Sequence, residues 1–223
     1  GRKLIQRLVT SNPSPAYVTR VARAFADDGR GVRGNLAAVV KAVLLDPEAR
    51  GPAKSEPGYG RLREPVLYVA NLCRALGARS DGVLAAQATA MGQNLWNPQT
   101  VFGYFSSDYE AAPDVAGPEF GIQSSTTAIS RLNFVSALLS TGIGRGTETG
   151  GTTVDLSRFV PLAGDPAALV SAFDRLLLHG TMTGEMARAV TAAVAAVPAA
   201  SALGRVQTAA WLVAGSSDYQ VAR

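Results

Sequence analysis

The most restrictive feature of this sequence is that apolar residues recur three or four positions apart, in one segment after another, between glycines and prolines. In residues 165–180 five apolar side chains fill one face of a helix: Leu169, Val170, Phe173, Leu176 and Leu177. Asp165 and Pro166 are typical of a helix start, and Gly180 of a helix end. Because no segment alternates apolar and polar residues for long, the sequence predicts an all-α fold, an irregular multi-helix bundle of about eight helices with long ordered loops.

The same spacing predicts helices in seven other segments, residues 15–28, 36–46, 64–76, 83–90, 124–140, 183–197 and 202–214. These helices suggest three regions along the chain. The first is a helical region over residues 1–140, which contains an irregular loop at 91–118. A Gly/Thr-rich linker follows at 141–164, and a C-terminal helical region at 165–223 is expected to pack with the first region as one domain.

Composition narrows the class of protein. With 223 residues, 47% of them hydrophobic, the chain is long and apolar enough to bury a sizeable core. No stretch reaches the ~18 consecutive apolar residues of a membrane span, so none is predicted. Residues 1–63 hold 12 of the 21 Lys and Arg residues and 5 of the 17 acidic ones, a balance of +7. Since these basic residues are scattered over helices without interleaved stacking aromatics, we predict no nucleic-acid binding.

The scarcity of histidine and cysteine limits the chemistry that this chain can carry alone. A catalytic triad needs a base beside its nucleophile, and a zinc site needs several converging ligands. The only histidine, His179, follows three leucines at a predicted helix end, where a cation interacts favourably with the helix dipole. The only cysteine, Cys73, lies on an apolar stripe and is expected in the core. We therefore predict no catalytic residue, no metal ligand and no cofactor here.

The loop at 91–118 is the one segment whose composition indicates recognition. It carries five of the fifteen aromatic residues, Trp96, Phe102, Tyr104, Phe105 and Tyr109, among the amides Gln93, Asn94, Asn97 and Gln99. Aromatic rings stack on sugars or planar groups while amides bond hydroxyls, so a carbohydrate or peptide ligand is expected. The candidate ligand-binding residues are Gln93, Asn94, Trp96, Asn97 and Tyr104. In the alternative interpretation the aromatics only anchor the loop to the core, and the amides bond its own backbone.

The same loop carries a resemblance to a known family. Residues 91–104, MGQNLWNPQTVFGY, resemble the G-Q-x-L-x-x-P-x-x-V-x-G loop of the domain-of-unknown-function 1800 family. Arg63–Pro65 resembles its K/R-x-P helix start, Arg131–Phe134 its R-x-N-F helix, and Ser217–Val221 its S-P-E-Y-Q terminus. The loop lacks the frequent double proline of the family. The resemblance keeps the motif order and spans nearly the whole chain.

The resemblance implies that this chain is the C-terminal, mostly helical half of a larger bacterial protein. The N-terminal half of such proteins bears a histidine-containing W-H-N-H-F type segment, and they are commonly exported, which implies a secreted or periplasmic location. Because residues 1–8 begin inside an apolar helical pattern, that missing half is the expected partner, covering an exposed apolar patch near the basic N-terminus. The expected function is a binding or scaffold module. The alternative is the non-catalytic wall of an enzyme acting on an extracellular polymer, with catalytic residues in the missing half.

Overall fold

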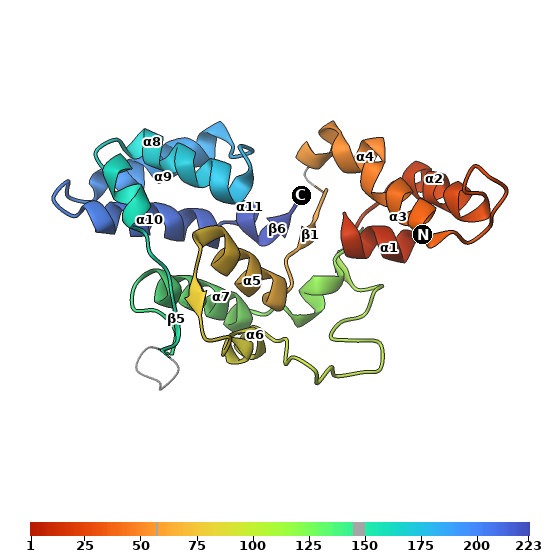
Figure 1. Cartoon of the computed structure of the whole chain (residues 1–223), viewed down its shortest axis with the longest axis horizontal. Coiled ribbons are helices and arrows are strands. Elements are labelled where there is room, and N and C mark those ends of the chain that lie inside the picture. The colour runs from red at the N-terminus through yellow and green to blue at the C-terminus, as the bar shows by residue number, and fades with distance from the viewer. Residues whose placement is uncertain (57, 145–149) are drawn as a thin grey trace. The chain divides into compact units, whose positions relative to one another are not determined.

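The computed structural model describes residues 1–56, 58–144 and 150–223 (Figure 1). Helices take up 58% of the chain, and the strands of the described residues form only two-stranded pairs. The predicted mostly helical, multi-helix fold is therefore confirmed. No helix in the described part of the chain combines the length and the apolarity needed to cross a bilayer.

The chain divides into two compact units whose boundaries differ from the regions predicted above. The first unit consists of residues 1–63, 99–121 and 221–223, and the second of residues 64–98 and 122–220. The difference arises because distant segments return to pair with the N-terminal third. Strand β6 (Val221–Ala222) pairs antiparallel with β1 (Arg61–Leu62), and Asn12 exchanges two hydrogen bonds with the backbone of Ala116.

The first unit is built on three helices, α1 (Arg2–Leu8), α2 (Pro15–Ala26) and α3 (Leu36–Leu45). Smaller elements complete it: α4 (Pro47–Arg50), η1 (Pro52–Ser55), β3 (Glu110–Ala112), β4 (Val115–Ala116) and the beginning of η2 (Pro118–Ile122). Its core consists of six buried residues, Ile5, Tyr17, Val21, Val39, Val43 and Ala49.

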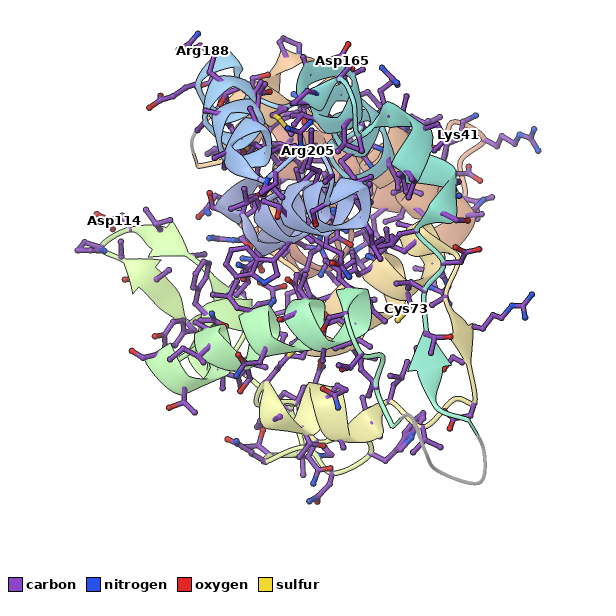
Figure 2. All side chains as sticks on the ribbon, turned by 90° about the vertical axis from the view of Figure 1, so that its left-hand side faces the viewer. Lys41, Cys73, Asp114, Asp165, Arg188 and Arg205 are labelled. Atoms are coloured by element: carbon purple, nitrogen blue, oxygen red, sulfur yellow. The ribbon has the colours of Figure 1, made fainter. Side chains whose placement is uncertain are left out.

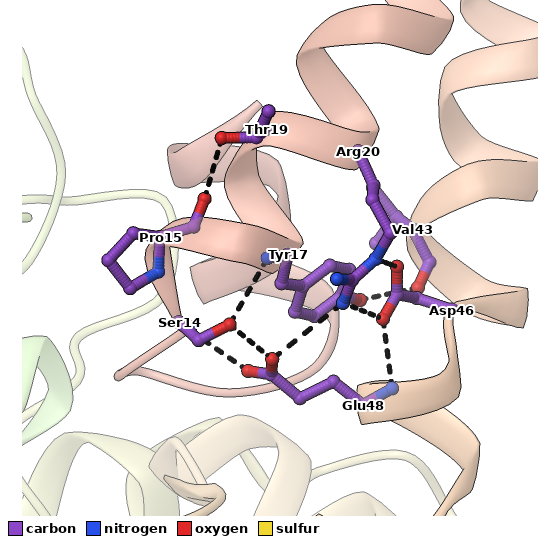
Figure 3. A network of polar contacts seen from close by, with 8 residues as sticks. All are labelled: Ser14, Pro15, Tyr17, Thr19, Arg20, Val43, Asp46 and Glu48. Carbon is purple, nitrogen blue, oxygen red and sulfur yellow. Dashed lines mark hydrogen bonds and ion pairs between the residues drawn. The ribbon is translucent and has the colours of Figure 1, made fainter.

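A polar network fixes how α2, α3 and α4 meet (Figure 3). Ser14 caps α2 by accepting a hydrogen bond from the backbone N–H of Tyr17. Arg20 on α2 donates from Nε and Nη2 to the buried Asp46 carboxylate at 2.6 and 2.7 Å. The same carboxylate caps α4 by accepting from the N–H of Glu48. Asp46 thus joins the start of α4 to the neighbouring helix α2, and its ion pair with Arg20 satisfies the buried carboxylate.

The second unit packs its helices around α10 (Ala202–Gly215), whose inward residues are almost fully buried. The other elements are α5 (Pro65–Leu76), β2 (Arg79–Ser80), α6 (Ala85–Ala90), α7 (Ser125–Leu139), β5 (Thr152–Thr153), η3 (Ser157–Leu162), α8 (Pro166–Phe173), the π-helical turn η4 (Asp174–Leu178), α9 (Gly184–Ala196) and α11 (Ser217–Gln220). Arg205 on α10 donates to the carbonyls of Val197 and Ala163 at 2.9 and 3.0 Å (Figure 2). Its guanidinium ties the turn after α9 to the one before α8.

The described part of the predicted Gly/Thr-rich linker belongs to this unit. Ile143 and Thr152 exchange two backbone hydrogen bonds of 2.8 and 2.7 Å, and β5 pairs with β2. Phe159 in η3 is buried, with its ring centroid 4.6 Å from that of Phe173. In the described part of this segment, strand pairing and one aromatic contact connect it to the rest of the unit. Residues 145–149 lie outside the described residues.

Candidate functional site

The loop that begins at residue 91 starts from a tightly packed base. Met91 is buried, and Gly92 has a backbone φ of +96°, a conformation that glycine adopts without strain. A Cβ atom on Gly92 would lie 2.9 Å from the carbonyl oxygen of Ile122. Only glycine therefore fits here without a shift of the backbone, so the orientation of the following residues is set by packing.

Gln93, the first of the five predicted ligand-binding residues, has both ends of its amide occupied. Its side chain is 2% exposed, Oε1 accepts from the backbone N–H of Val66 at 2.9 Å, and Nε2 donates to Oε2 of Glu64 at 2.9 Å. Val66 lies in the first turn of α5, where backbone N–H groups lack partners inside the helix. Gln93 thus supplies a hydrogen-bond acceptor to the start of α5, although it is distant in the sequence. Its buried side chain supports the base of the loop and does not reach the surface.

Trp96 takes the opposite position. Its side chain is 97% exposed, and its backbone has a φ of +64°, in the left-handed region that large side chains rarely adopt. The N–H of Asn97 donates to the carbonyl of Asn94 at 3.1 Å, which closes a turn around the tryptophan. Both asparagine side chains are exposed. We call residues 94–97 the Trp96 turn; it presents an indole ring to solvent with an amide on either side in sequence.

The remaining aromatic residues lie in the first unit and fall into two groups. Thr100 and Gly103 close a second tight turn, with the N–H of Gly103 donating to the carbonyl of Thr100 at 3.1 Å. The two residues at its centre, Val101 and Phe102, are almost fully exposed. Tyr104, the last predicted site residue, is partly buried.

Phe105 and Tyr109 form the second group, because both lie beside Gly121; Phe105 is partly buried and Tyr109 is 43% exposed. A Cβ atom on Gly121 would meet Cβ of Phe105 at 3.2 Å and the ring of Tyr109 at 3.6 Å. The aromatic residues of the loop therefore differ in position: Phe105 and Tyr109 lie beside Gly121, while Trp96 and Phe102 face solvent. The five predicted residues accordingly divide among a buried support, Gln93, an exposed turn with Asn94, Trp96 and Asn97, and the partly buried Tyr104.

His179 and Cys73 take up different positions, one exposed and one buried. His179 ends η4 with a φ of +59° and is exposed. Cys73 lies in the core of the second unit (Figure 2), and burial raises the pKa of its thiol, so the protonated, unreactive form is favoured at neutral pH. Within the residues that the structure describes, no three His, Cys, Asp or Glu side chains come together as metal ligands.

A groove between α2 and α3 is a feature that the sequence analysis missed. Its volume is about 470 Å³, and its lining consists of Ala24, Asp27, Asp28, Gly29, Ala38, Lys41, Ala42, Leu45 and Asp46. The Asp27 carboxylate accepts from the N–H groups of Gly29 and Gly31, and that of Asp28 from Arg30 and Val32. These acids therefore shape the loop between the helices. The small side chains Ala24 on α2 and Ala38 and Ala42 on α3 line this groove, and they are the feature of the sequence that favours it.

The family model described as "Protein of unknown function (DUF1800)" matches residues 1–221. The chain belongs to the DUF1800 family. No curated protein and no solved structure matches it. Several residues that carried the DUF1800 resemblance have structural roles: Gly92 and Gln93 hold the loop base, and the buried Arg131 lies with its guanidinium carbon 5.1 Å from the ring centroid of Tyr68. The buried Tyr219 packs on the same ring, with centroids 5.7 Å apart.

Proposed function

We propose that this DUF1800 chain is a helical binding module that contacts its ligand through the Trp96 turn. The observation that carries the proposal is the nearly complete exposure of Trp96 on a left-handed backbone. Such a conformation costs a non-glycine residue on the order of 1 kcal/mol, and an unburied indole forgoes about 2 kcal/mol of hydrophobic stabilisation. Trp96 therefore lies in a position that lowers stability, and it lies on a loop base that Gly92 and Gln93 hold firmly. Such a combination is typical of a residue that contacts a ligand.

The chemistry of the turn favours a carbohydrate. An indole face stacks on the C–H face of a pyranose ring, and the amides of Asn94 and Asn97 each offer a donor and an acceptor to sugar hydroxyls. One stacked ring and two neutral hydrogen bonds contribute roughly 4 kcal/mol together, which corresponds to a Kd near 1 mM. Affinity of this size suits repeated contacts along a polysaccharide, where linked sites add to each other.

Tryptophan fluorescence tests the proposal directly, because the chain has only two tryptophans, Trp96 and Trp211 on α10, which is 37% exposed. In the Trp211→Phe variant, emission comes from Trp96 alone. Titration with soluble oligosaccharides of different linkages is expected to shift this emission to shorter wavelength as the indole becomes covered. A panel of short peptides, titrated in the same way, tests the peptide alternative.

Isothermal titration calorimetry with the oligosaccharide that binds most tightly then compares wild type with matched variants. Trp96→Ala is expected to abolish binding, and Asn97→Ala to weaken it several-fold. Phe102→Ala removes an equally exposed aromatic side chain from the other turn and is expected to leave binding unchanged. Equal affinities of wild type and Trp96→Ala for every sugar, or binding of peptides alone, would reject the carbohydrate proposal.

We further propose that the module works within a larger exported bacterial protein, with an N-terminal half as its partner. The resemblance described above supports this proposal, together with eight exposed large apolar residues in the first 45: Leu4, Leu8, Phe25, Val32, Leu36, Val40, Leu44 and Leu45. Fractionation of cells that express the native gene tests it. A product of about the mass of this chain alone, 23.1 kDa, found only in the cytosol, would contradict it.

A further inference from the structure

The segments that carry and support the Trp96 turn have almost no charge. Residues 82–98 and 122–144 contain one charged residue, Arg131, although 17% of the whole chain is charged. Arg131 is fully buried, with its guanidinium over the ring of Tyr68, so no charged side chain of these segments reaches solvent. Because charged side chains normally lie at the surface of a protein, two partly exposed segments without any at their surface are unusual.

Both segments belong to the second unit, where they lie together. Helix α6 in the first segment packs against α7 in the second (Figure 1). The base of the Trp96 turn reaches the same place, because a Cβ atom on Gly92 would lie 3.6 Å from Cγ2 of Thr127 in the first turn of α7. The Trp96 turn therefore begins beside the start of α7.

The outer side of α7 carries hydroxyl and amide groups. Thr126, Ile129, Asn133 and Ser136 follow one another three or four residues apart, so they lie along one side of the helix, and all four are exposed. We call these four residues the α7 row. Within the described part of the chain, the side chains of Asn133 and Ser136 have no hydrogen-bond partner. The α7 row thus offers free donors and acceptors beside one apolar side chain, the 57% exposed Ile129.

We propose that the carbohydrate bound at the Trp96 turn is an uncharged polysaccharide whose chain continues over the α7 row. This inference rests on the function proposed above and adds the class of ligand. A carboxylate or ammonium group on the sugar would lose hydration here without gaining an opposite charge from these segments, so charged polysaccharides are disfavoured. Neutral hydroxyls need only the donors and acceptors that the α7 row and the two asparagines of the turn supply.

A protein partner fits the α7 row less well than a sugar chain. Protein interfaces are poor in serine and have an apolar or aromatic centre, whereas the α7 row has one apolar residue among hydroxyl and amide groups. The large apolar residues assigned above to an N-terminal half all lie within residues 1–45 of the first unit. That assignment therefore leaves the α7 row available to the ligand of the Trp96 turn.

Oligosaccharides that differ in charge test the ligand class, with the emission of Trp96 in the Trp211→Phe variant as the readout. Methyl-esterified and free oligogalacturonates form a neutral and anionic pair, and oligomers of N-acetylglucosamine and of glucosamine form a neutral and cationic pair. Neutral α- and β-linked glucans complete the panel. The tightest binder is expected to be neutral and to bind at least about tenfold tighter than every charged member. Its affinity should not change with salt.

Calorimetry with a disaccharide and a hexasaccharide of the tightest binder tests the path over α7. The hexasaccharide is expected to bind about tenfold tighter than the disaccharide, because it reaches beyond the Trp96 turn. Ile129→Ala and Asn133→Ala should each weaken the hexasaccharide several-fold and leave the disaccharide unchanged. Leu203→Ala removes a side chain of similar exposure from α10 and should affect neither sugar.

Circular dichroism of each variant checks that the fold is retained. A charged sugar as the tightest binder, or hexasaccharide binding that neither α7 variant weakens, would overturn the inference and leave the role of Trp96 intact. If no oligosaccharide changes the emission of Trp96, the proposed function itself fails, and this inference fails with it.

Discussion

Replacing Gln93 with alanine is expected to lower the free energy of unfolding by about 3 kcal/mol. The substitution leaves the partly buried N–H of Val66 without its acceptor, which costs about 1–2 kcal/mol, and removes a donor from the buried Glu64 carboxylate, a bond of about 1.5 kcal/mol or more. Urea denaturation followed by circular dichroism measures the change. Gln99→Ala removes the same side chain from an exposed position and is expected to stay within about 0.5 kcal/mol of wild type.

The charged replacement Gln93→Glu tests the same reasoning in a second way. Its carboxylate can still accept from the N–H of Val66, but it loses the donor to Glu64 and places a second carboxylate against it, so this variant is expected to be less stable than wild type at pH 7. If Gln93→Ala is as stable as Gln99→Ala, the amide does not hold the start of α5 and the reasoning fails.

Three further predictions concern other parts of the chain. Gly92→Ala is expected to lose about 2 kcal/mol more than Gly29→Ala in urea denaturation, because both have positive φ but only at Gly92 would Cβ meet a backbone oxygen; equal losses would contradict this. The ion pair lowers the pKa of Asp46 from 3.8, so it stabilises the fold above that pH and is lost as the pH falls through the lowered value; Asp46→Asn should be less stable at pH 7, and the difference should shrink in acid. A thiol reagent should label Cys73 much more slowly in the native than in the urea-unfolded chain, and equal rates would place the thiol at the surface.

The regular helices were predictable because their signals are local. Asp165 and Pro166 start α8, and Ser14 and Pro15 start α2, as the sequence indicated. The helix expected to continue to Gly180 changes instead to the π-helical η4, where the Asp174 carboxylate accepts from the N–H of Met182 eight residues on. That bond depends on the fold of the following turn, so spacing alone could not predict it.

The candidate site was predicted less completely, for the same physical reason. Composition marked the aromatic–amide loop, but the role of each amide depends on what lies beside it in space. Gln93 is buried at the start of α5, where it accepts a hydrogen bond from a residue 27 positions earlier in the sequence. The exposure of Trp96 comes with a positive φ, which normally falls on glycine or asparagine, so the sequence did not mark a left-handed turn at a tryptophan.

The pairing of β1 with β6 has a consequence for the order in which the protein folds during synthesis. Arg61 lies opposite Ala222, so the ribosome makes about 160 residues between the two strands, which takes roughly 10–30 s at typical elongation rates. Within that interval every residue of the second unit has been translated, while β1 still lacks its neighbour. Gly60 fits so closely that a Cβ there would lie 2.6 Å from the carbonyl oxygen of Ala222. Of the two units, the first is therefore completed after the second during synthesis, and until then the edge of β1 stays unpaired.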